Sequence, residues 1–147
     1  MKKLLIIPII AMMASCNCKK EAAGEEKGSS RQPTFEVLSE SAYQGRENES
    51  FEIVKDKATL EALYQSVNIE NVPVIDFTQQ RVVALFLGQK NSGGHAIKVK
   101  NVTEKDNKVY VEVEKLGPKP GENATMAITN PYTIVKINSN KEIVVNK

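Results

Sequence analysis

The sequence has little of what most catalytic and metal sites are built from. Its 147 residues include one histidine, two cysteines and no tryptophan, and aromatic residues make up 5% of the chain. Both cysteines, Cys16 and Cys18, lie near the N-terminus. The rest of the chain therefore cannot contain a disulfide, a cysteine-based zinc site or a catalytic cysteine. A domain made from that remainder has to be held together by its apolar core alone.

The sequence also lacks an excess of charge of either sign. The formal net charge is +2, and Lys2 and Lys3 account for it. A nucleic-acid-binding protein, or one that binds membrane surfaces through a polybasic segment, carries a basic patch or stripe. Glycine-rich phosphate-binding motifs and the zinc-protease motif His-Glu-x-x-His do not occur either. We therefore expect no nucleic-acid partner, no cofactor, no metal and no enzymatic activity.

The N-terminus instead has the pattern of an export signal. Two lysines after Met1 are followed by the apolar run Leu4–Met13 and then by Ala14, Ser15 and Cys16. A basic start, an apolar run of about ten residues and a small-residue cleavage site are typical of a secretory signal, and the run is too short to span a bilayer. A cysteine directly after the small residues resembles the signal of bacterial lipoproteins. This resemblance implies cleavage before Cys16 and acyl chains, such as palmitate, on that residue.

The lipoprotein-like signal leads to a chain organised in three parts. Residues 1–15 are predicted to be the signal, and residues 16–33 the lipidated N-terminus with a polar tether that has no hydrophobic period. Residues 34–147 are predicted to form one β-rich domain. The expected location is the bacterial cell envelope, with the chain anchored in the lipid bilayer through Cys16 and the domain facing the periplasm or the cell exterior.

Hydrophobic periodicity indicates a mainly β domain with one short helix. Asp56 is suited to cap a helix of about ten residues. The apolar residues of that helix share one face: Leu60, Leu63, Tyr64 and Val67. Six consecutive apolar residues, Val82–Leu87, predict a central strand buried on both faces. The other predicted strands are Phe35–Ser39, Ser50–Lys55, Ala96–Val102, Lys108–Lys115, Thr125–Ile128, Tyr132–Ile137 and Glu142–Val145.

Four of these strands are predicted to form two hairpins. Residues 96–102 pair with 108–115, and residues 132–137 pair with 142–145. Short strands with turn signals every ten or so residues favour a compact antiparallel β-sandwich or a partly open barrel.

The first candidate partner-binding loop leaves the predicted central strand. It carries Asn91, Ser92, Gly93, Gly94 and His95. Consecutive glycines permit positive φ and a close backbone approach, and loops on a rigid sheet often carry function. The alternative is a hairpin loop without a ligand.

The second candidate loop contains Asn130, Pro131 and Tyr132. Proline fixes one backbone angle, and tyrosine offers an amphipathic contact surface; the alternative is a simple turn that enters a strand. The single histidine also leaves one enzymatic alternative, a hydrolase with Ser92 as nucleophile and His95 as base. Such a pair needs a hydrogen bond between the two side chains and a third group that orients the ring.

Several segments occur in the order found in one bacterial protein family. They are Pro73–Phe77, Val82–Gly88, Ser92–Ile97, Pro118–Gly121 and Asn130–Ile137. From about residue 60 to 138 the chain resembles the PrcB family. The family pattern is approximately Gly-x-x-x-Thr-Gly-Gly-Tyr-x-Ile, followed by Pro-Tyr-x-Ile-Val. Here Ser92 stands in place of the threonine, and His95 in place of the tyrosine.

The PrcB family is named after an accessory lipoprotein of a surface protease complex. The resemblance therefore implies a non-enzymatic accessory or binding protein, which stabilises or regulates an exported protease or binds another envelope protein. A glycine-rich loop followed by a proline-aromatic segment also resembles chagasin-type inhibitors of cysteine proteases, which are β-sandwiches that insert loops into the protease cleft. This alternative requires the two candidate loops to lie at the same end of the fold.

Overall fold

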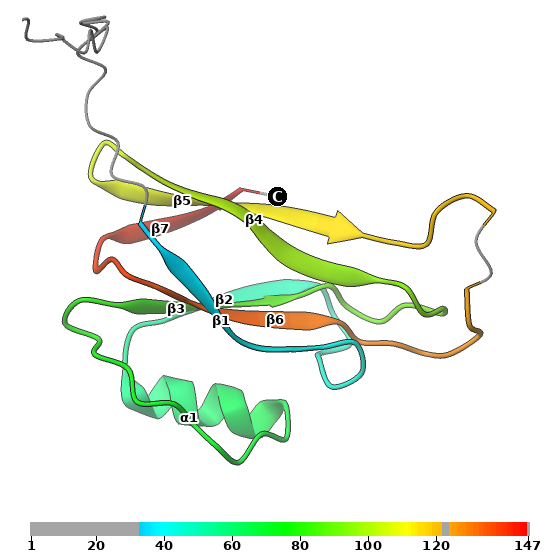
Figure 1. Cartoon of the computed structure of the whole chain (residues 1–147). Helices are drawn as coiled ribbons and strands as arrows, with labels where there is room; N and C mark the ends of the chain where they lie inside the picture. The colour runs from blue at the N-terminus through cyan, green and yellow to red at the C-terminus, as the bar shows by residue number, and fades with distance from the viewer. Residues whose placement is uncertain (1–32, 122–123, 147) are drawn as a thin grey trace, which may run out of the picture.

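The computed structural model describes residues 33–121 and 124–146, and Figure 1 shows its elements. The predicted signal, Cys16 and all of the predicted tether except Pro33 lie outside the described residues. No helix among the described residues has the length and apolar character needed to span a membrane. In chain order the elements are β1 (Phe35–Ser41), β2 (Ser50–Val54), α1 (Lys57–Ser66), β3 (Arg81–Phe86), β4 (Ala96–Lys105), β5 (Lys108–Leu116), β6 (Tyr132–Ile137) and β7 (Glu142–Asn146).

The strands form two sheets that pack face to face. One sheet has the order β1-β6-β3-β2 and the other the order β4-β5-β7. All neighbours are antiparallel except β5 and β7, which are parallel. Helix α1 covers the outer face of the four-stranded sheet, so the layers are helix, sheet and sheet (Figure 1). The predicted mainly β sandwich is confirmed, and the sheets do not close into a barrel.

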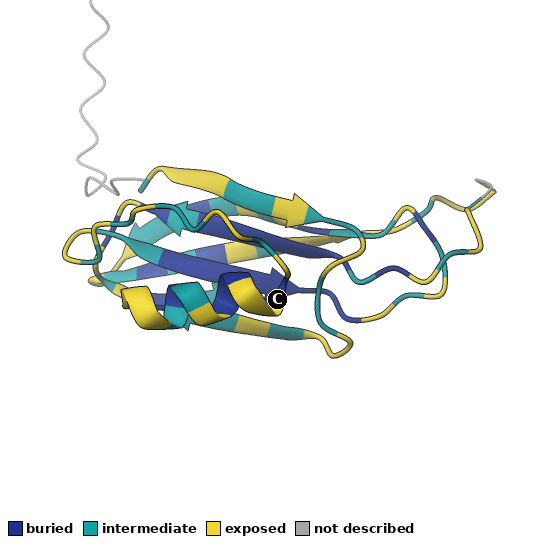
Figure 2. Cartoon of the chain, turned by 90° about the horizontal axis from the view of Figure 1, so that it is seen from below, coloured by how far each residue is buried: buried dark blue, intermediate teal, exposed yellow. Residues whose placement is uncertain are grey.

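Strand β3 takes part in the cores on both sides of the larger sheet. Val82, Ala84 and Phe86 pack toward α1, whereas Val83 and Leu85 pack toward the smaller sheet. All five are at most 1% exposed. Figure 2 shows the buried stripe that follows from this arrangement, with the helix in front of it. The prediction of a central strand buried on both faces is confirmed.

Helix α1 begins and packs as its sequence pattern predicts. The Asp56 carboxylate accepts hydrogen bonds from the Thr59 amide at 2.8 Å and from the Thr59 hydroxyl at 2.9 Å. These bonds stabilise the charged form and hold the pKa of Asp56 below its usual value. The predicted apolar face is buried against β3 and β6.

Two of the strand predictions are wrong. Residues 125–128 form no strand: the Thr125 carbonyl accepts one hydrogen bond from the Gly93 amide, and the isolated bridge nearby joins Lys90 to Thr129, one residue beyond the segment. Strands β6 and β7 form no hairpin, because β6 pairs with β1 and β3 while β7 pairs with β5 in the other sheet. The reason is that β1 and β3 occupy the two edges of β6, so no edge is left to which β7 could pair.

One buried hydrogen bond joins the two sheets directly. The Thr133 hydroxyl of β6 donates to the Ile97 carbonyl of β4 at 2.5 Å. Both residues are at most 4% exposed. A carbonyl that loses such a donor inside a core keeps the cost of its lost hydration. This bond therefore fixes the start of β4 over the start of β6.

Thr133→Val is expected to lower the free energy of unfolding by about 1–3 kcal/mol, because the shape is kept while the Ile97 carbonyl loses its donor. Urea denaturation of the full chain measures this change. Thr133→Ser keeps the hydroxyl and is the matched control, with a smaller loss expected. Equal stability of the valine variant and the unaltered chain would contradict the importance of this bond.

Candidate functional site

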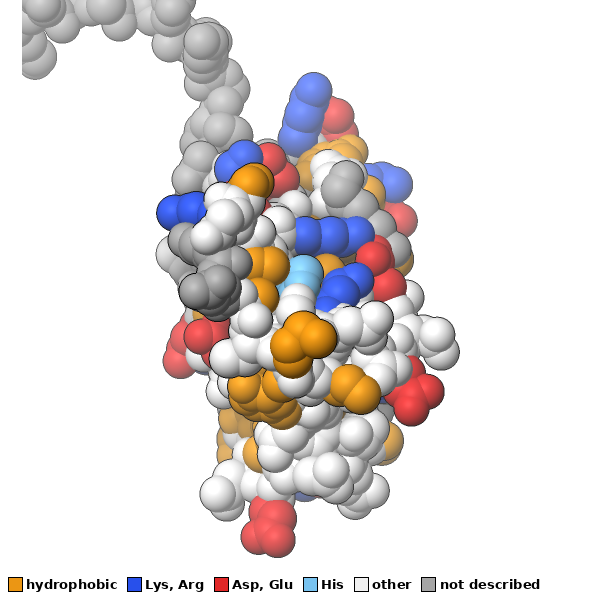
Figure 3. Space-filling model, turned by 90° about the vertical axis from the view of Figure 1, so that its right-hand side faces the viewer, with side chains coloured by type: hydrophobic (Ala, Val, Ile, Leu, Met, Phe, Trp, Pro, Cys, Tyr) orange, Lys and Arg blue, Asp and Glu red, His pale blue; other side chains and the backbone are white. Residues whose placement is uncertain are grey.

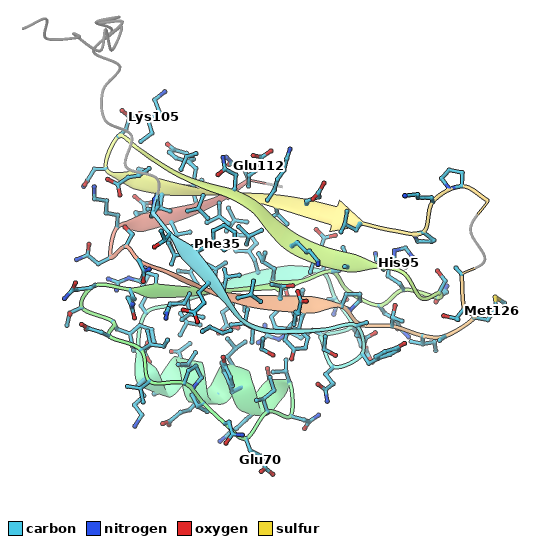
Figure 4. All side chains as sticks on the ribbon, viewed as in Figure 1. Phe35, Glu70, His95, Lys105, Glu112 and Met126 are labelled. Atoms are coloured by element: carbon cyan, nitrogen blue, oxygen red, sulfur yellow. The ribbon has the colours of Figure 1, made fainter. Side chains whose placement is uncertain are left out.

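The two candidate loops lie side by side at one end of the sandwich. The Lys90 amide donates to the Thr129 carbonyl at 2.8 Å, and the Thr129 amide donates back at 2.9 Å. The Thr129 hydroxyl also donates to the Ser92 carbonyl at 2.9 Å. The structure thus brings the Asn91–His95 and Asn130–Tyr132 segments together, at the end on the right of Figures 1 and 4. The condition set by the inhibitor alternative, a shared end for both loops, is met.

A third segment completes this end, and sequence analysis missed it. The Asn130 amide donates to the Ala42 carbonyl, and the Gly45 amide donates to the Asn130 carbonyl, each at 2.8 Å. A Cβ atom on Gly45 would lie 2.5 Å from the Asn130 carbonyl oxygen, so only glycine allows this approach. The signal present in the sequence was an aromatic residue, Tyr43, between the end of a predicted strand and a glycine. The three segments are held together largely by backbone hydrogen bonds.

Ser92 and His95 are within hydrogen-bond reach of each other. The Ser92 Oγ and the His95 Nε2 are 3.1 Å apart. The other side of the ring faces Gly117, where an added Cβ atom would lie 3.3 Å from Nδ1. Within the described part of the chain, no carboxylate forms a hydrogen bond or ion pair with this histidine. The pair therefore has the nucleophile-to-base contact of a hydrolase without the third group that orients the base.

Pro131 and Tyr132 are buried, which contradicts the expectation that Tyr132 offers an exposed contact surface. Tyr132 is 2% exposed, and its hydroxyl forms a 2.9 Å hydrogen bond with the Ser39 hydroxyl. Its ring packs against Phe86 with 6.1 Å between centroids. The Arg46 guanidinium lies 4.3 Å from the centroid of the Phe86 ring. Pro131 and Tyr132 thus belong to the core, and they support the loop that precedes them.

Three large apolar side chains are exposed at this end. Tyr43 and Ile128 are each 65% exposed, and Met126 is 97% exposed. Seen from this end, hydrophobic side chains surround the single histidine, with lysine or arginine side chains beside them (Figure 3). Figure 4 shows Met126 at the tip of the loops and His95 behind it. We call Tyr43, Met126 and Ile128 the loop-end surface; His95 lies beside it and is only partly exposed.

A groove leads from the loop-end surface along the side of the sandwich. It lies between β1 and β4, with Thr133 of β6 at its floor. Next to His95 it forms a hollow of about 230 Å³, and a second hollow of about 490 Å³ continues along the strands. We call it the β1–β4 groove, defined by residues 37–42, residues 95–99 and Thr133. Among the described residues no group of three or more histidine, cysteine or acidic side chains is placed to hold a metal ion.

Gly45→Ala is expected to disrupt the junction of the three segments, because the new methyl group overlaps the Asn130 carbonyl. The Gly45 and Asn130 amides should exchange with solvent about tenfold faster or more, since their hydrogen bonds lengthen or break. Hydrogen exchange resolved by residue measures this, with the β3 amides as the internal control. Unchanged exchange at both amides would show that the junction tolerates a side chain.

One comparison with known proteins supports the motif-based resemblance. The family model described as PrcB C-terminal matches residues 81–138, which run from the start of β3 to the residue after β6. Neither a curated protein nor a solved structure matches the chain. The matched segment contains both candidate loops, half of the buried residues of the core beneath α1 and nearly all of those of the core between the two sheets. The resemblance to the PrcB family that the sequence motifs indicate is therefore confirmed over residues 81–138, which match the family's C-terminal domain.

Proposed function

We propose that this chain is a lipid-anchored accessory protein of the bacterial cell envelope, without enzymatic activity, which binds and stabilises an exported protease or protease-associated protein. The match to the PrcB C-terminal family supports a role alongside a protease complex in general terms. The observation that carries the proposal is the loop-end surface, where three large apolar side chains are exposed together.

The composition of the loop-end surface favours a protein partner. Aromatic and methionine side chains are enriched in the centres of protein interfaces, and exposed apolar groups gain nothing in an isolated chain. Thr129, Asn130 and Gly45 hold the loops beneath this surface by backbone and side-chain hydrogen bonds. Loops that are already held in place lose less conformational entropy on binding. A preformed apolar surface of this kind suits a stable accessory contact.

The position of the chain start supports the same arrangement. The described chain begins at Pro33, at the end of the sandwich opposite the loops (Figure 1). Thr34 is joined to Asn138 in the turn between β6 and β7 at this end. An anchor at Cys16, which we infer from the lipoprotein-like signal, would hold the domain by the end that faces away from the loop-end surface. The partner surface would then point away from the bilayer.

Protease inhibition by the same loops is the second candidate function, and the shared end of the two loops is the observation in its favour. Because Pro131 and Tyr132 are buried, the segments exposed at this end are Asn91–His95, residues 124–128 and the segment that carries Tyr43. Residual activity of papain-like proteases mixed with the full chain distinguishes the two functions. Inhibition at stoichiometric concentrations would favour the inhibitor, and full activity would favour the accessory role.

Met126→Asp combined with Ile128→Asp is expected to reduce recovery of the partner about tenfold or more, because charges replace apolar contacts at the centre of the interface. The measurement is affinity capture of the membrane-anchored chain from its own cells, with quantitative mass spectrometry of the bound proteins. Val74→Asp is the matched control, because Val74 is apolar and fully exposed but lies in the segment after α1. Equal recovery of the same partner by both variants would refute the proposed surface.

His95→Gln is expected to leave the accumulation of the captured protease unchanged. Glutamine keeps a hydrogen-bonding group beside Ser92 but removes the imidazole base that a hydrolase needs. Accumulation of the captured protease, measured by immunoblotting of cells that carry the variant, tests this. Normal capture with loss of the mature protease would instead indicate that Ser92 and His95 carry out chemistry.

A further inference from the structure

The two sides of the sandwich at which the edges of the sheets face each other differ in how tightly they are closed. On one side, β2 faces β5 and β7, and the Lys115 ammonium bonds to the Glu49 carboxylate at 2.6 Å across the gap. Only about 10 Å³ of space remains there. On the other side, between β1 and β4, the β1–β4 groove stays open over both of its hollows. No salt bridge among the described residues crosses it.

Strand β1 presents an unpaired edge to this groove. It pairs with β6 on one side, and no described strand pairs with it on the other. The Asn138 amide donates to the Thr34 carbonyl, so alternation along the strand turns the main-chain groups of Phe35 and Val37 away from β6. A β-bulge lies between Val37 and Ser39. A row of free main-chain donors and acceptors is a template for another strand.

The facing edge of β4 is less available. The Ile97 carbonyl already accepts the Thr133 hydroxyl, and the Val102 amide donates to the Asn101 side chain at 2.9 Å. Both bonds use groups that an added strand would otherwise take. Strand β1, rather than β4, is therefore the edge at which an added strand can pair, and β4 forms the opposite wall.

The side chains along the groove suit an extended peptide. Val37 lies opposite Val135 in the sheet, yet it is 47% exposed, whereas Val135 is fully buried. Phe35, opposite the buried Ile137, is 36% exposed. The smaller sheet has one strand fewer and leaves these two side chains uncovered. Apolar residues at alternate positions of an added strand would cover Val37 by cross-strand contact.

Two charges stand on opposite walls of the groove. Glu40 of β1 and Lys98 of β4 are exposed and line both hollows. Neither forms an ion pair with another residue that the structure describes. A peptide with a basic residue near Glu40 and an acidic residue near Lys98 would form an ion pair with each of these two side chains. Main-chain pairing would supply affinity, and these charges would supply orientation.

We propose that the β1–β4 groove binds an extended peptide segment of the partner, which pairs as an additional strand with β1. This rests on the proposed function, because it names the form in which part of the partner is bound. The groove opens beside His95, so a partner that covers the loop-end surface can continue into the groove with one extended segment.

The probe is a phage-displayed library of linear peptides of about ten residues, the length of a long strand, selected on the immobilised full chain. Selected peptides are expected to alternate apolar and polar residues. Val37→Pro removes a main-chain donor from the open edge while the hydrogen bonds between β1 and β6 remain. It is expected to weaken binding of a synthetic selected peptide about tenfold or more. Val37→Thr keeps the donor and the β-branched shape, and is the matched control with near-normal binding expected.

A scan of N-methylated peptides gives a second measurement that leaves the protein unaltered. Methylation at every second position is expected to abolish binding and at the intervening positions to have little effect, because alternate amides of an added strand point toward β1. An affinity that is insensitive to methylation, or equal for Val37→Pro and Val37→Thr, would overturn the proposal. So would the absence of any enriched peptide, or self-association of the chain that Val37→Pro abolishes.

The proposal and the proposed function can fail separately. The combined Met126→Asp and Ile128→Asp variant could lose partner capture while Val37→Pro changes neither peptide binding nor partner capture. This result would support the accessory role and refute strand addition. Peptide binding that depends on Val37 but not on the loop-end surface, with no captured partner, would support the groove and refute the accessory role.

Discussion

The burial of β3 on both faces is the constraint on which the rest of the structure depends. A strand whose successive side chains are all apolar cannot leave one face in water, so it needs a cover on each side. Helix α1 supplies one cover and the β4-β5-β7 sheet supplies the other. Strand β6 has the same requirement, and it lies beside β3 between the same two layers. The three-layer arrangement follows from these two strands.

The candidate sites lie where this arrangement is incomplete. A four-stranded sheet packed on a three-stranded sheet leaves one edge strand, β1, only partly covered. At the end of the sandwich where Tyr132 lies, β1 and β3 each lead into a loop and β6 is preceded by one. Backbone hydrogen bonds at Thr129, Asn130 and Gly45 join these three loops. The core therefore provides a rigid base, while the exposed apolar side chains lie on loops at its end. A binding surface on rigid supports is the common arrangement for recognition proteins.

Ser92 and His95, the two residues that differ from the family pattern, fit their surroundings in the structure. Ser92 keeps the hydroxyl of the family's threonine, and here that hydroxyl contacts the His95 ring at 3.1 Å. His95 keeps a ring that lies against Gly117, in a groove end formed also by Pro131 and Tyr132. The histidine therefore occupies a position where a tyrosine of the family pattern would line the same hollow. The side-chain chemistry at this position differs from the family pattern, while its place at the mouth of the groove follows from its position directly before β4.

Local sequence was sufficient to predict most helices and strands but not to predict which strands pair with each other. Periodicity predicted α1 and the burial of β3 on both faces, and the short carboxylate of Asp56 predicted the helix cap, because each depends on residues close together in the chain. Which strands pair is decided by residues far apart in the chain. The sequence pattern of β6 and β7 is that of a hairpin, but β1 and β3 occupy both edges of β6, and β7 pairs with β5 in the other sheet. The burial of Tyr132 and the exposure of Tyr43, Met126 and Ile128 likewise follow only from the packing of distant segments. Hence the sequence by itself determined the helix, the central strand and the family resemblance. Only the tertiary structure decided which loops lie together and which strand edge stays unpaired, because both depend on contacts between segments far apart in the chain.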